Sequence, residues 1–187
     1  MPKDLIDRRP PEDIAAVVLP VIGGADVARS RLEESRGLAE ALGVKLAFAE
    51  QLNVREPHPA RLLGAGQLDA LQRRFKEDGV TLFIVDGALT PVQQRNLEME
   101  LKLKVVDRTG LILEIFGLRA RTAEGRLQVE MARSLYERSR LVRTWTHLER
   151  QRGGFGFLGG PGETQIESDR RAIDDQVIRL KRQLDRV

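Results

Sequence analysis

The sequence predicts an α/β fold: a small parallel β-sheet flanked by helices, followed by a long antiparallel α-helical hairpin with coiled-coil-like packing. Two observations predict this fold class. In the first part of the chain, short β-branched apolar runs alternate with helical patterns, as in repeated strand–helix–strand units. In the last part, apolar residues recur every three or four positions with few helix breakers. We therefore expect an α/β subdomain over residues 1–118 and a hairpin subdomain over residues 119–187.

The strands of the α/β subdomain are predicted from runs that are apolar on consecutive positions. Such runs are typical of strands whose two faces are both covered by helices. Strands joined through helices are parallel and connected by right-handed crossovers. The predicted strands cover residues 15–20, 44–50, 81–87 and 104–108.

Helix start signals lie between these strands. Ser30 with Glu33, and Thr90 with Gln93, fit the capping box in which two side chains satisfy the first free amides of a helix. Pro91 occupies the first helical position, which proline favours. The segment 110–121 is short enough to be a strand, but its apolar spacing favours a helix.

The hairpin is predicted from two amphipathic stretches, residues 122–152 and 164–187. The second is expected to begin at a capping box formed by Thr164 and Glu167. Between the stretches lies a glycine-rich tip loop, residues 153–163. The stripe expected to face the second helix consists of Leu127, Met131, Leu135, Arg138, Val142, Trp145 and Leu148.

Composition excludes several classes of protein. The chain has no cysteine, so it has neither disulfides nor thiolate metal sites. No apolar run approaches the roughly 20 residues of a membrane-spanning helix. The amino-terminal residues have no apolar signal-peptide core, which favours a cytoplasmic protein.

Positive charge is concentrated in the second half. Residues 119–187 hold 15 Lys+Arg against 10 Asp+Glu, whereas residues 1–118 hold 16 against 18. Nearly all of the basic residues in the second half are arginine, whose planar fork suits phosphates and bases. A solvated helix surface with many ion pairs is the alternative interpretation.

The tip loop is the strongest candidate for binding RNA. Its glycines let the backbone approach a partner closely, its phenylalanines can stack on unpaired bases, and the flanking arginines can neutralise phosphates. The alternative is an ordinary helix connection whose phenylalanines cap the coiled coil. The predicted RNA-binding residues are Arg150, Arg152, Gly153, Gly154, Phe155, Gly156, Phe157, Gly159, Gly160, Pro161, Arg170 and Arg171.

Other polar positions carry weaker signals. Gly64, Gly66 and Gln67 precede a helix and form a weak candidate for nucleotide phosphate binding, with a tight turn as the alternative. Asp86 and Asp107 follow strands, and we expect Asp86 to cap the turn before Thr90. A salt-linked joint between the subdomains is expected from Arg119 and Arg121 with Glu114, Glu124 and Glu130.

No catalytic residue or metal ligand stands out. His58 and His147 are far apart in the sequence and suggest neither a base nor a ligand. No segment has the G-x-x-x-x-G-K-[ST] spacing of a phosphate loop, so GTP hydrolysis is assigned to no residue of this chain.

Several long motifs resemble the HflX family of ribosome-associated translational GTPases. The most specific is the GPGETQ…DRR pattern within GGFGFLGGPGETQIESDRR, residues 153–171. The others are DGALTPVQQRNL at 86–97, VDRTGLILE at 106–114, IFGLRARTAEGRLQVEMA at 115–132 and HLERQRGG at 147–154. Two positions depart from the family pattern: Gln67 stands where family members commonly have a lysine, and Leu158 where a basic residue often precedes GPGETQ.

The resemblance implies an amino-terminal region that binds the large ribosomal subunit and its rRNA. It implies that the hairpin tip points toward the peptidyl-transferase centre and helps to split stalled ribosomes under stress. GTP and Mg²⁺ would bind a following GTPase domain, with no cofactor in this chain. Two alternatives remain open: an ATP-binding, RNA-remodelling domain, and a regulatory module that restrains its own GTPase domain.

Overall fold

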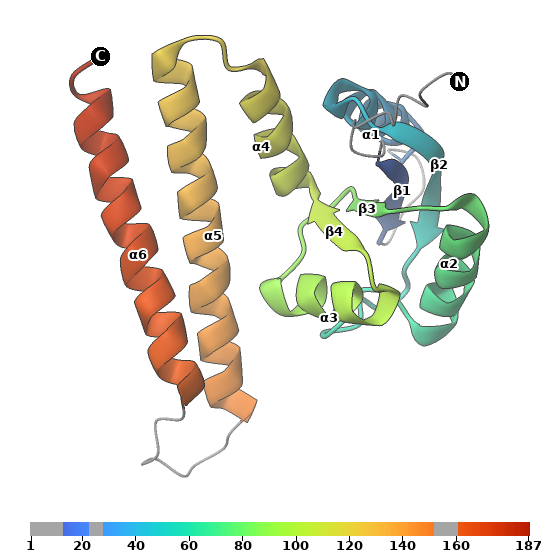
Figure 1. The fold of residues 1–187 in the computed structure, drawn as a ribbon. Helices are drawn as coiled ribbons and strands as arrows, with labels where there is room; N and C mark the ends of the chain where they lie inside the picture. Colours follow the sequence, from blue (N-terminus) through green and yellow to red (C-terminus); the bar gives the residue numbers. More distant parts are fainter. Residues whose placement is uncertain (1–12, 23–27, 152–160) are drawn as a thin grey trace, which may run out of the picture.

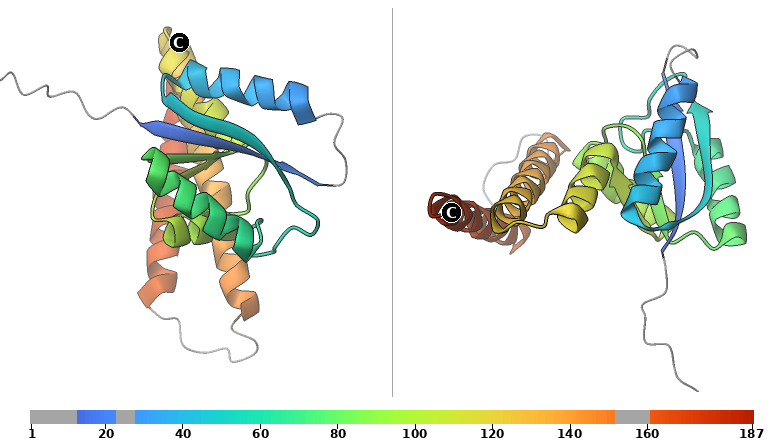
Figure 2. Two further views of the ribbon diagram at one scale, coloured as in Figure 1. Left: turned by 90° about the vertical axis from the view of Figure 1, so that its right-hand side faces the viewer. Right: turned by 90° about the horizontal axis from the view of Figure 1, so that it is seen from above.

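A computed structural model describes residues 13–22, 28–151 and 161–187, with side chains described for 13–22, 30–141 and 167–187. A β-sheet with helices on both faces leads through one further helix into two long helices that lie side by side (Figure 1). This confirms the predicted fold class. Figure 2 shows from above that the two long helices stand on one side of the sheet layer.

The sheet has the strand order β2-β1-β3-β4, and every neighbouring pair is parallel. The first crossover places β2 on one side of β1, and the next places β3 on the other side. The carboxyl ends of β3 and β4 therefore lie next to each other, with Val85 paired to Asp107. The strands are β1 (Ile14–Val21), β2 (Lys45–Asn53), β3 (Leu82–Val85) and β4 (Lys104–Asp107).

Helices alternate with these strands and then continue into the hairpin. The predicted capping box at Thr90 is confirmed, because Thr90 Oγ1 accepts from Gln93 N at 3.1 Å and Gln93 Oε1 accepts from Thr90 N at 2.9 Å. The helices are α1 (Ala28–Leu42), α2 (Ala65–Asp78), α3 (Pro91–Leu101), α4 (Arg108–Arg119), α5 (Ala123–Gln151) and α6 (Pro161–Leu184). The segment 110–121 is thus largely helical, as predicted.

Two predicted helix starts were wrong. The first helix begins at Ala28, so Ser30 lies inside its first turn rather than at its cap. The last helix begins at Pro161, within the predicted tip loop and three residues before Thr164. Proline is well suited to the first helical position because its φ is already helical and it has no amide to satisfy.

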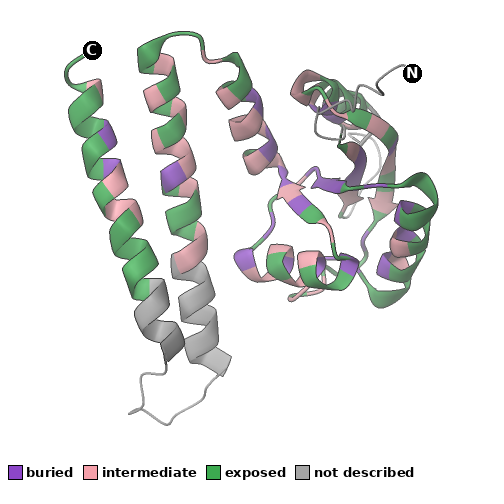
Figure 3. Ribbon diagram, viewed as in Figure 1, coloured by how far each residue is buried: buried purple, intermediate pink, exposed green. Residues whose placement is uncertain are grey.

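Each face of the sheet carries its own hydrophobic core. In Figure 3 the buried residues of the α/β layer gather on the strands and on the helices around them. Because successive side chains of β1 point to opposite faces, Ala16 and Val18 join one core while Ala15 and Val17 join the other. The first core contains Phe83, whose ring centroid lies 5.1 Å from that of Phe75. The second core is closed by α1 and α4. Both layers are therefore needed to cover the sheet.

The two hairpin helices pack together along a seam that the sequence pattern described only in part. Val177 and Leu180 of α6 are buried there, and Ser134 is 3% exposed, whereas Leu135 is 42% exposed. The predicted stripe was therefore wrong by one residue at Leu135. At the exposed margin of the seam, Arg138 Nε of α5 pairs with Asp174 Oδ1 of α6 at 2.7 Å. Val142, Trp145 and Leu148 lie outside the residues whose side chains are described.

The burial of each phenylalanine predicts how much it contributes to the free energy of unfolding. Replacing Phe83, which is 0% exposed, by alanine should lower the free energy of unfolding by about 3–5 kcal/mol, because it removes a ring from both aromatic packing and the core. Phe116→Ala is the matched control, since Phe116 is 56% exposed and should change it by less than about 0.5 kcal/mol. Urea unfolding followed by circular dichroism measures both. Equal losses would contradict this assignment of the core.

Candidate functional site: the hairpin and its joint with the sheet

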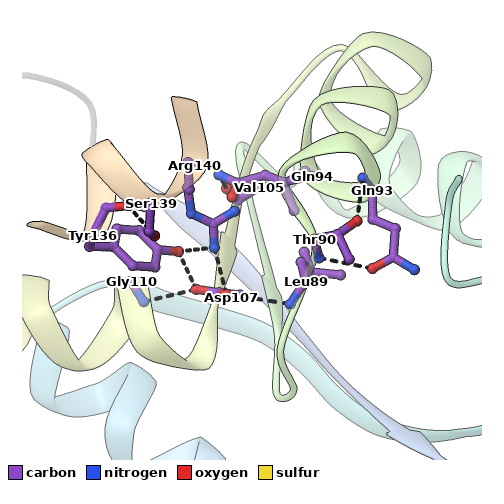
Figure 4. A network of polar contacts seen from close by, with 10 residues as sticks. All are labelled: Leu89, Thr90, Gln93, Gln94, Val105, Asp107, Gly110, Tyr136, Ser139 and Arg140. Atoms are coloured by element: carbon purple, nitrogen blue, oxygen red, sulfur yellow. Dashed lines mark hydrogen bonds and ion pairs between the residues drawn. The ribbon is translucent and has the colours of Figure 1, made fainter. Parts of the chain in front are cut away.

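Asp107 joins the hairpin to the sheet. It ends β4, is 2% exposed, and receives hydrogen bonds from other elements (Figure 4). Its Oδ1 accepts from Gly110 N at 2.9 Å and from Tyr136 Oη at 2.5 Å. Its Oδ2 accepts from Arg140 Nη2 at 2.7 Å and from Leu89 N at 3.4 Å. One carboxylate therefore caps α4, holds the turn before α3 and fixes the middle of α5.

Two glycines of α4 lie against side chains that take part in the contact between α4 and α5. A Cβ at Gly110 would stand 3.3 Å from Asp107 Oδ1 and 3.4 Å from Tyr136 Oη. A Cβ at Gly117 would stand 2.2 Å from Arg133 Nη2, because Arg133 crosses α4 at this point. Arg133 thereby reaches Glu114, with Nη2 to Oε2 at 2.9 Å. The spacing of seven residues places both glycines on one face of α4.

The joint raises the pKa of Tyr136 well above its ordinary value. Burial is the main cause, because a phenolate loses hydration there, and the hydrogen bond to the Asp107 carboxylate adds to it. Arg140 opposes this effect. Its guanidinium lies 4.2 Å from the centroid of the tyrosine ring and also donates to the phenol oxygen. Tyr136 therefore remains a neutral donor to Asp107 at ordinary pH.

A second buried carboxylate, Asp86, lies at the end of the neighbouring strand β3. It is 3% exposed and accepts from Arg108 Nη1 at 2.8 Å, Arg31 Nε at 3.2 Å and Ser35 Oγ at 2.6 Å. The predicted cap on the turn before Thr90 was therefore wrong. A carboxylate this deeply buried needs charged partners, and two arginines supply them.

Arg108 connects the two carboxylate clusters, because it directly follows Asp107 and points to Asp86. Its other guanidinium nitrogen, Nη2, lies 2.6 Å from Glu34 Oε1 of α1. The hydrogen bond to Asp86 is the main reason why the pKa of Arg108 is raised. Asp107, the last residue of β4, thus contacts α5, and Arg108, the first residue of α4, contacts α1.

The prediction that Arg119 and Arg121 form a salt-linked joint between the subdomains was wrong. Arg119 and Arg121 form no ion pair within the part of the chain that the structure describes, and Arg133 is the partner of Glu114. Glu124 instead accepts from Gln128 Nε2 at 3.0 Å, and Glu130 accepts from Gln176 Nε2 at 3.3 Å. The sequence could not show this, because the choice depends on how α4 and α5 are rotated toward each other.

Gly64 caps the beginning of α2, and both polar atoms of the Gln67 side chain form hydrogen bonds there. Its Oε1 accepts from Gly64 N at 3.2 Å, and its Nε2 donates to Asn53 O at 2.8 Å. Gly64 has φ −71°, which any residue adopts, so backbone conformation does not require a glycine there. Nucleotide binding at Gly64, Gly66 and Gln67 stays a prediction.

Most of the predicted RNA-binding residues lie outside the described side chains. Arg152 to Gly160 are not described, while Arg150 and Pro161 lie in α5 and α6 without described side chains. Arg170 and Arg171 are exposed on α6, and Arg171 Nη2 pairs with Glu167 Oε1 at 2.7 Å. RNA binding at the tip therefore stays a prediction.

The described residues contain neither a cluster of metal ligands nor a membrane-spanning helix. Within residues 13–22, 28–151 and 161–187, no group of three or more histidines, aspartates or glutamates is arranged to hold a metal ion. In the same ranges no helix combines the length and the apolar character needed to cross a bilayer. What the described residues do contain is the polar joint at Asp107 and exposed arginines on α6.

Comparisons with known proteins match both parts of the chain. Residues 29–117 match the family model "GTP-binding GTPase N-terminal", and residues 119–187 match "GTP-binding GTPase Middle Region". The GTPase HflX of Magnetococcus marinus is 52% identical over 162 residues, covering 87% of this chain and 38% of that protein. The chain belongs to the HflX family.

Other relatives agree with this membership. The GTPase HflX of Escherichia coli is 42% identical over 172 residues, covering 92% of this chain and 40% of that protein. The chain thus spans about two fifths of the length of these HflX relatives. A GTP-binding protein from Sulfolobus solfataricus, solved in complex with GDP, has the same fold over 92% of this chain and 45% of its own. That likeness has a TM-score of 0.65 at 20% identity.

Among the residues that the sequence did not single out in this HflX chain are the two partners of Asp107, Tyr136 and Arg140. A signal for them exists, because tyrosine and arginine four residues apart share one helix face, and Asp107 ends a strand. That signal shows only that they are neighbours. It does not show that their face of α5 is turned toward β4.

The joint predicts an alkaline titration that can be followed at a single residue. Tyr136 is the only tyrosine, so tyrosinate absorbance near 295 nm reports on it alone. In the folded protein the absorbance should rise only well above pH 10, whereas in denaturant it should rise near pH 10. Since the folded pKa is the higher one, this group's contribution to stability is full below pH 10 and is lost as pH rises beyond it.

Asp107→Asn separates the causes of this shift. The substitution removes the carboxylate charge but leaves burial, so the folded pKa of Tyr136 should fall partway and stay above its ordinary value. Asp175→Asn, at an exposed position of α6, is the control and should leave the titration unchanged. A folded wild-type titration centred at pH 10 would refute the described joint.

Proposed function

We propose that this chain is the ribosome-binding amino-terminal part of an HflX-type GTPase that acts in the cytoplasm. It docks on the large ribosomal subunit and its rRNA, places the hairpin tip near the peptidyl-transferase centre and helps to dissociate stalled ribosomes under stress. A GTPase domain outside this chain binds GTP and Mg²⁺ and times the cycle by hydrolysis. The observation that carries the proposal is a long helix pair fixed at mid-length to the sheet by Asp107.

The length and attachment of the hairpin favour action at a distance. At about 1.5 Å per residue, the 29 residues of α5 span roughly 43 Å. Its described contacts with the α/β layer include Arg133, Tyr136 and Arg140, and the helix then continues past α3 (Figure 1). A rigid arm of this kind delivers its far end to a set position once the α/β layer is docked.

The charge of the arm is suited to RNA. Arg170 and Arg171 are exposed near the beginning of α6, on the side of the tip. Each arginine that contacts a phosphate releases a counterion, so binding should weaken as salt rises. At the tip itself we assign phosphate contacts to Arg150 and Arg152 and base stacking to Phe155 and Phe157.

The ATP-binding alternative has no such support. Its candidate segment has Gln67 where a phosphate-binding lysine would be needed, and the Gln67 amide already bonds Gly64 and Asn53. The regulatory alternative requires a surface that contacts the GTPase domain.

Co-sedimentation of this purified chain with isolated large ribosomal subunits tests the proposal across a salt series. Wild type should bind in a salt-sensitive manner, and deletion of Phe155–Gly160 should weaken binding while leaving the circular dichroism melting curve unchanged. Replacing Arg170 and Arg171 by glutamine should reduce the slope of log K against log salt by roughly 1–2, from about 0.7–0.9 per lost phosphate contact.

The matched control is Arg73→Gln, at an exposed position of α2 on the other side of the sheet. It should leave both affinity and salt slope unchanged. The proposal fails if wild type does not bind the subunit, or if the deletion binds and splits ribosomes as wild type does when placed in the full-length protein.

A further inference from the structure

Helix α3 carries an exposed ridge made of Arg95, Met99 and Lys102. These residues recur at i, i+4 and i+7 and so share one side of the helix, while Leu97 and Leu101 are buried on the other side. Met99 is 59% exposed. In the part of the chain that the structure describes, neither Arg95 nor Lys102 forms an ion pair. The α3 ridge is therefore two cations with an apolar side chain between them.

The carboxylates of α3 do not neutralise this ridge. Glu98 Oε1 accepts from Val105 N at 3.2 Å and thereby caps the outer edge of β4. Glu100 Oε1 lies 3.3 Å from Arg61 Nη1. Both acidic side chains of the helix are thus engaged by other elements. A solvated helix face is the ordinary explanation for exposed charges, and the backbone at the end of the helix argues against it here.

Lys102 adopts a backbone conformation that is unfavourable for a residue with a side chain. It caps the carboxyl end of α3 with φ 55° and ψ 40°, in the left-handed region where glycine is usual. Leu62 also has a positive φ, but its side chain packs in the core, which explains why a glycine does not stand there. Lys102 is exposed, so packing does not explain its side chain. Strained positions of this kind cluster at sites that contact a ligand or partner.

The ridge is turned toward the same end of the molecule as the hairpin tip. The helices α2 and α3 cover the sheet face nearer to the end of α5 and the beginning of α6, and α1 covers the opposite face (Figures 1 and 2). Because Leu97 and Leu101 point to the sheet, the ridge points away from it, toward that end. From Arg140 at the joint to Gln151, α5 rises roughly 16 Å. A surface that receives the tip therefore also faces α3.

We propose that the α3 ridge is a second RNA-binding surface, at which Arg95 and Lys102 contact phosphates of the ribosomal RNA that receives the hairpin tip. Met99 lies between them, where its flexible apolar side chain covers a sugar. RNA rather than an acidic protein is the partner, because RNA carries a charge at every nucleotide and so reaches both the ridge and the exposed Arg170 and Arg171 of α6. The inference rests on the proposed function for its partner, the large ribosomal subunit.

Replacing Lys102 by glycine should change stability and binding in opposite directions. Glycine adopts the left-handed conformation without steric cost, so the urea midpoint should rise. Loss of one phosphate contact should weaken binding of the purified chain to isolated large ribosomal subunits severalfold, and should lower the slope of log K against log salt by about 0.7–0.9. Arg95→Gln should weaken binding to a similar extent.

Two further variants separate charge from backbone conformation and from position. Lys102→Gln removes the charge but keeps the left-handed conformation, so it should weaken binding as glycine does without raising the urea midpoint. Arg36→Gln, at an exposed position of α1 on the opposite face of the sheet, should change neither binding nor the midpoint. A binding loss with Arg36→Gln as large as that with Lys102→Gln would overturn the proposal, because the effect would then be one of net charge.

A label on the ridge identifies what lies over it. The chain has no cysteine, so Met99→Cys can carry a single photoreactive aryl azide. In the complex with large subunits the label should cross-link to ribosomal RNA, giving a product that ribonuclease destroys. Cross-links to ribosomal protein alone would overturn the assignment to RNA.

Failure of this inference differs from failure of the proposed function. If wild type binds the subunit and deletion of Phe155–Gly160 weakens binding, while Lys102→Gly and Arg95→Gln bind as wild type does, the α3 ridge is refuted and the hairpin proposal stands. If wild type does not bind the subunit, both are refuted.

Discussion

The structure depends on one constraint: the carboxylate of Asp107 is buried and must be satisfied. Burial of an ionised carboxylate without partners costs several kcal/mol, so the surrounding elements have to bring donors to it. They are the first turn of α4, the turn before α3 and the middle of α5. The two oxygens of one carboxylate thereby fix the start of α4, the turn before α3 and the middle of α5 relative to β4.

This constraint explains why a thin helical hairpin can act as a defined arm. Two helices alone form little core, and the other described contacts of α5 with the α/β layer are those with α3 and with α4, including the ion pair of Arg133 with Glu114. Asp107 sets the rotation of α5, and Arg108 carries the connection on to Asp86 and α1. The hairpin, the carboxyl ends of β3 and β4, and α1 therefore form one continuous polar network along a single sheet edge.

Much of the fold follows from local pattern, because consecutive apolar runs and helical periodicity are properties of each segment alone. The strands, the capping box at Thr90 and the helical character of 110–121 were predicted on that basis. The roles of Asp86, Arg133 and Tyr136 were not, since they depend on how whole helices are rotated in the assembled fold. Leu135 shows the same limit: a stripe at three- and four-residue spacing leaves the phase of a helix uncertain by one position, and Ser134 is the residue that is buried. The tip residues, which carry the proposed RNA contact, lie outside the described part of the chain.

The most direct test of this account is the distance distribution between spin labels on the sheet layer and the hairpin. The chain has no cysteine, so cysteines introduced at the exposed positions Glu77 of α2 and Gln183 of α6 are the only labelled sites. Double electron–electron resonance should give a narrow distribution in the otherwise wild-type chain and a clearly broader one with Asp107→Asn, while Asp175→Asn should leave it narrow. A distribution that is equally narrow with Asp107→Asn would show that the hairpin is held by other contacts and would contradict the account.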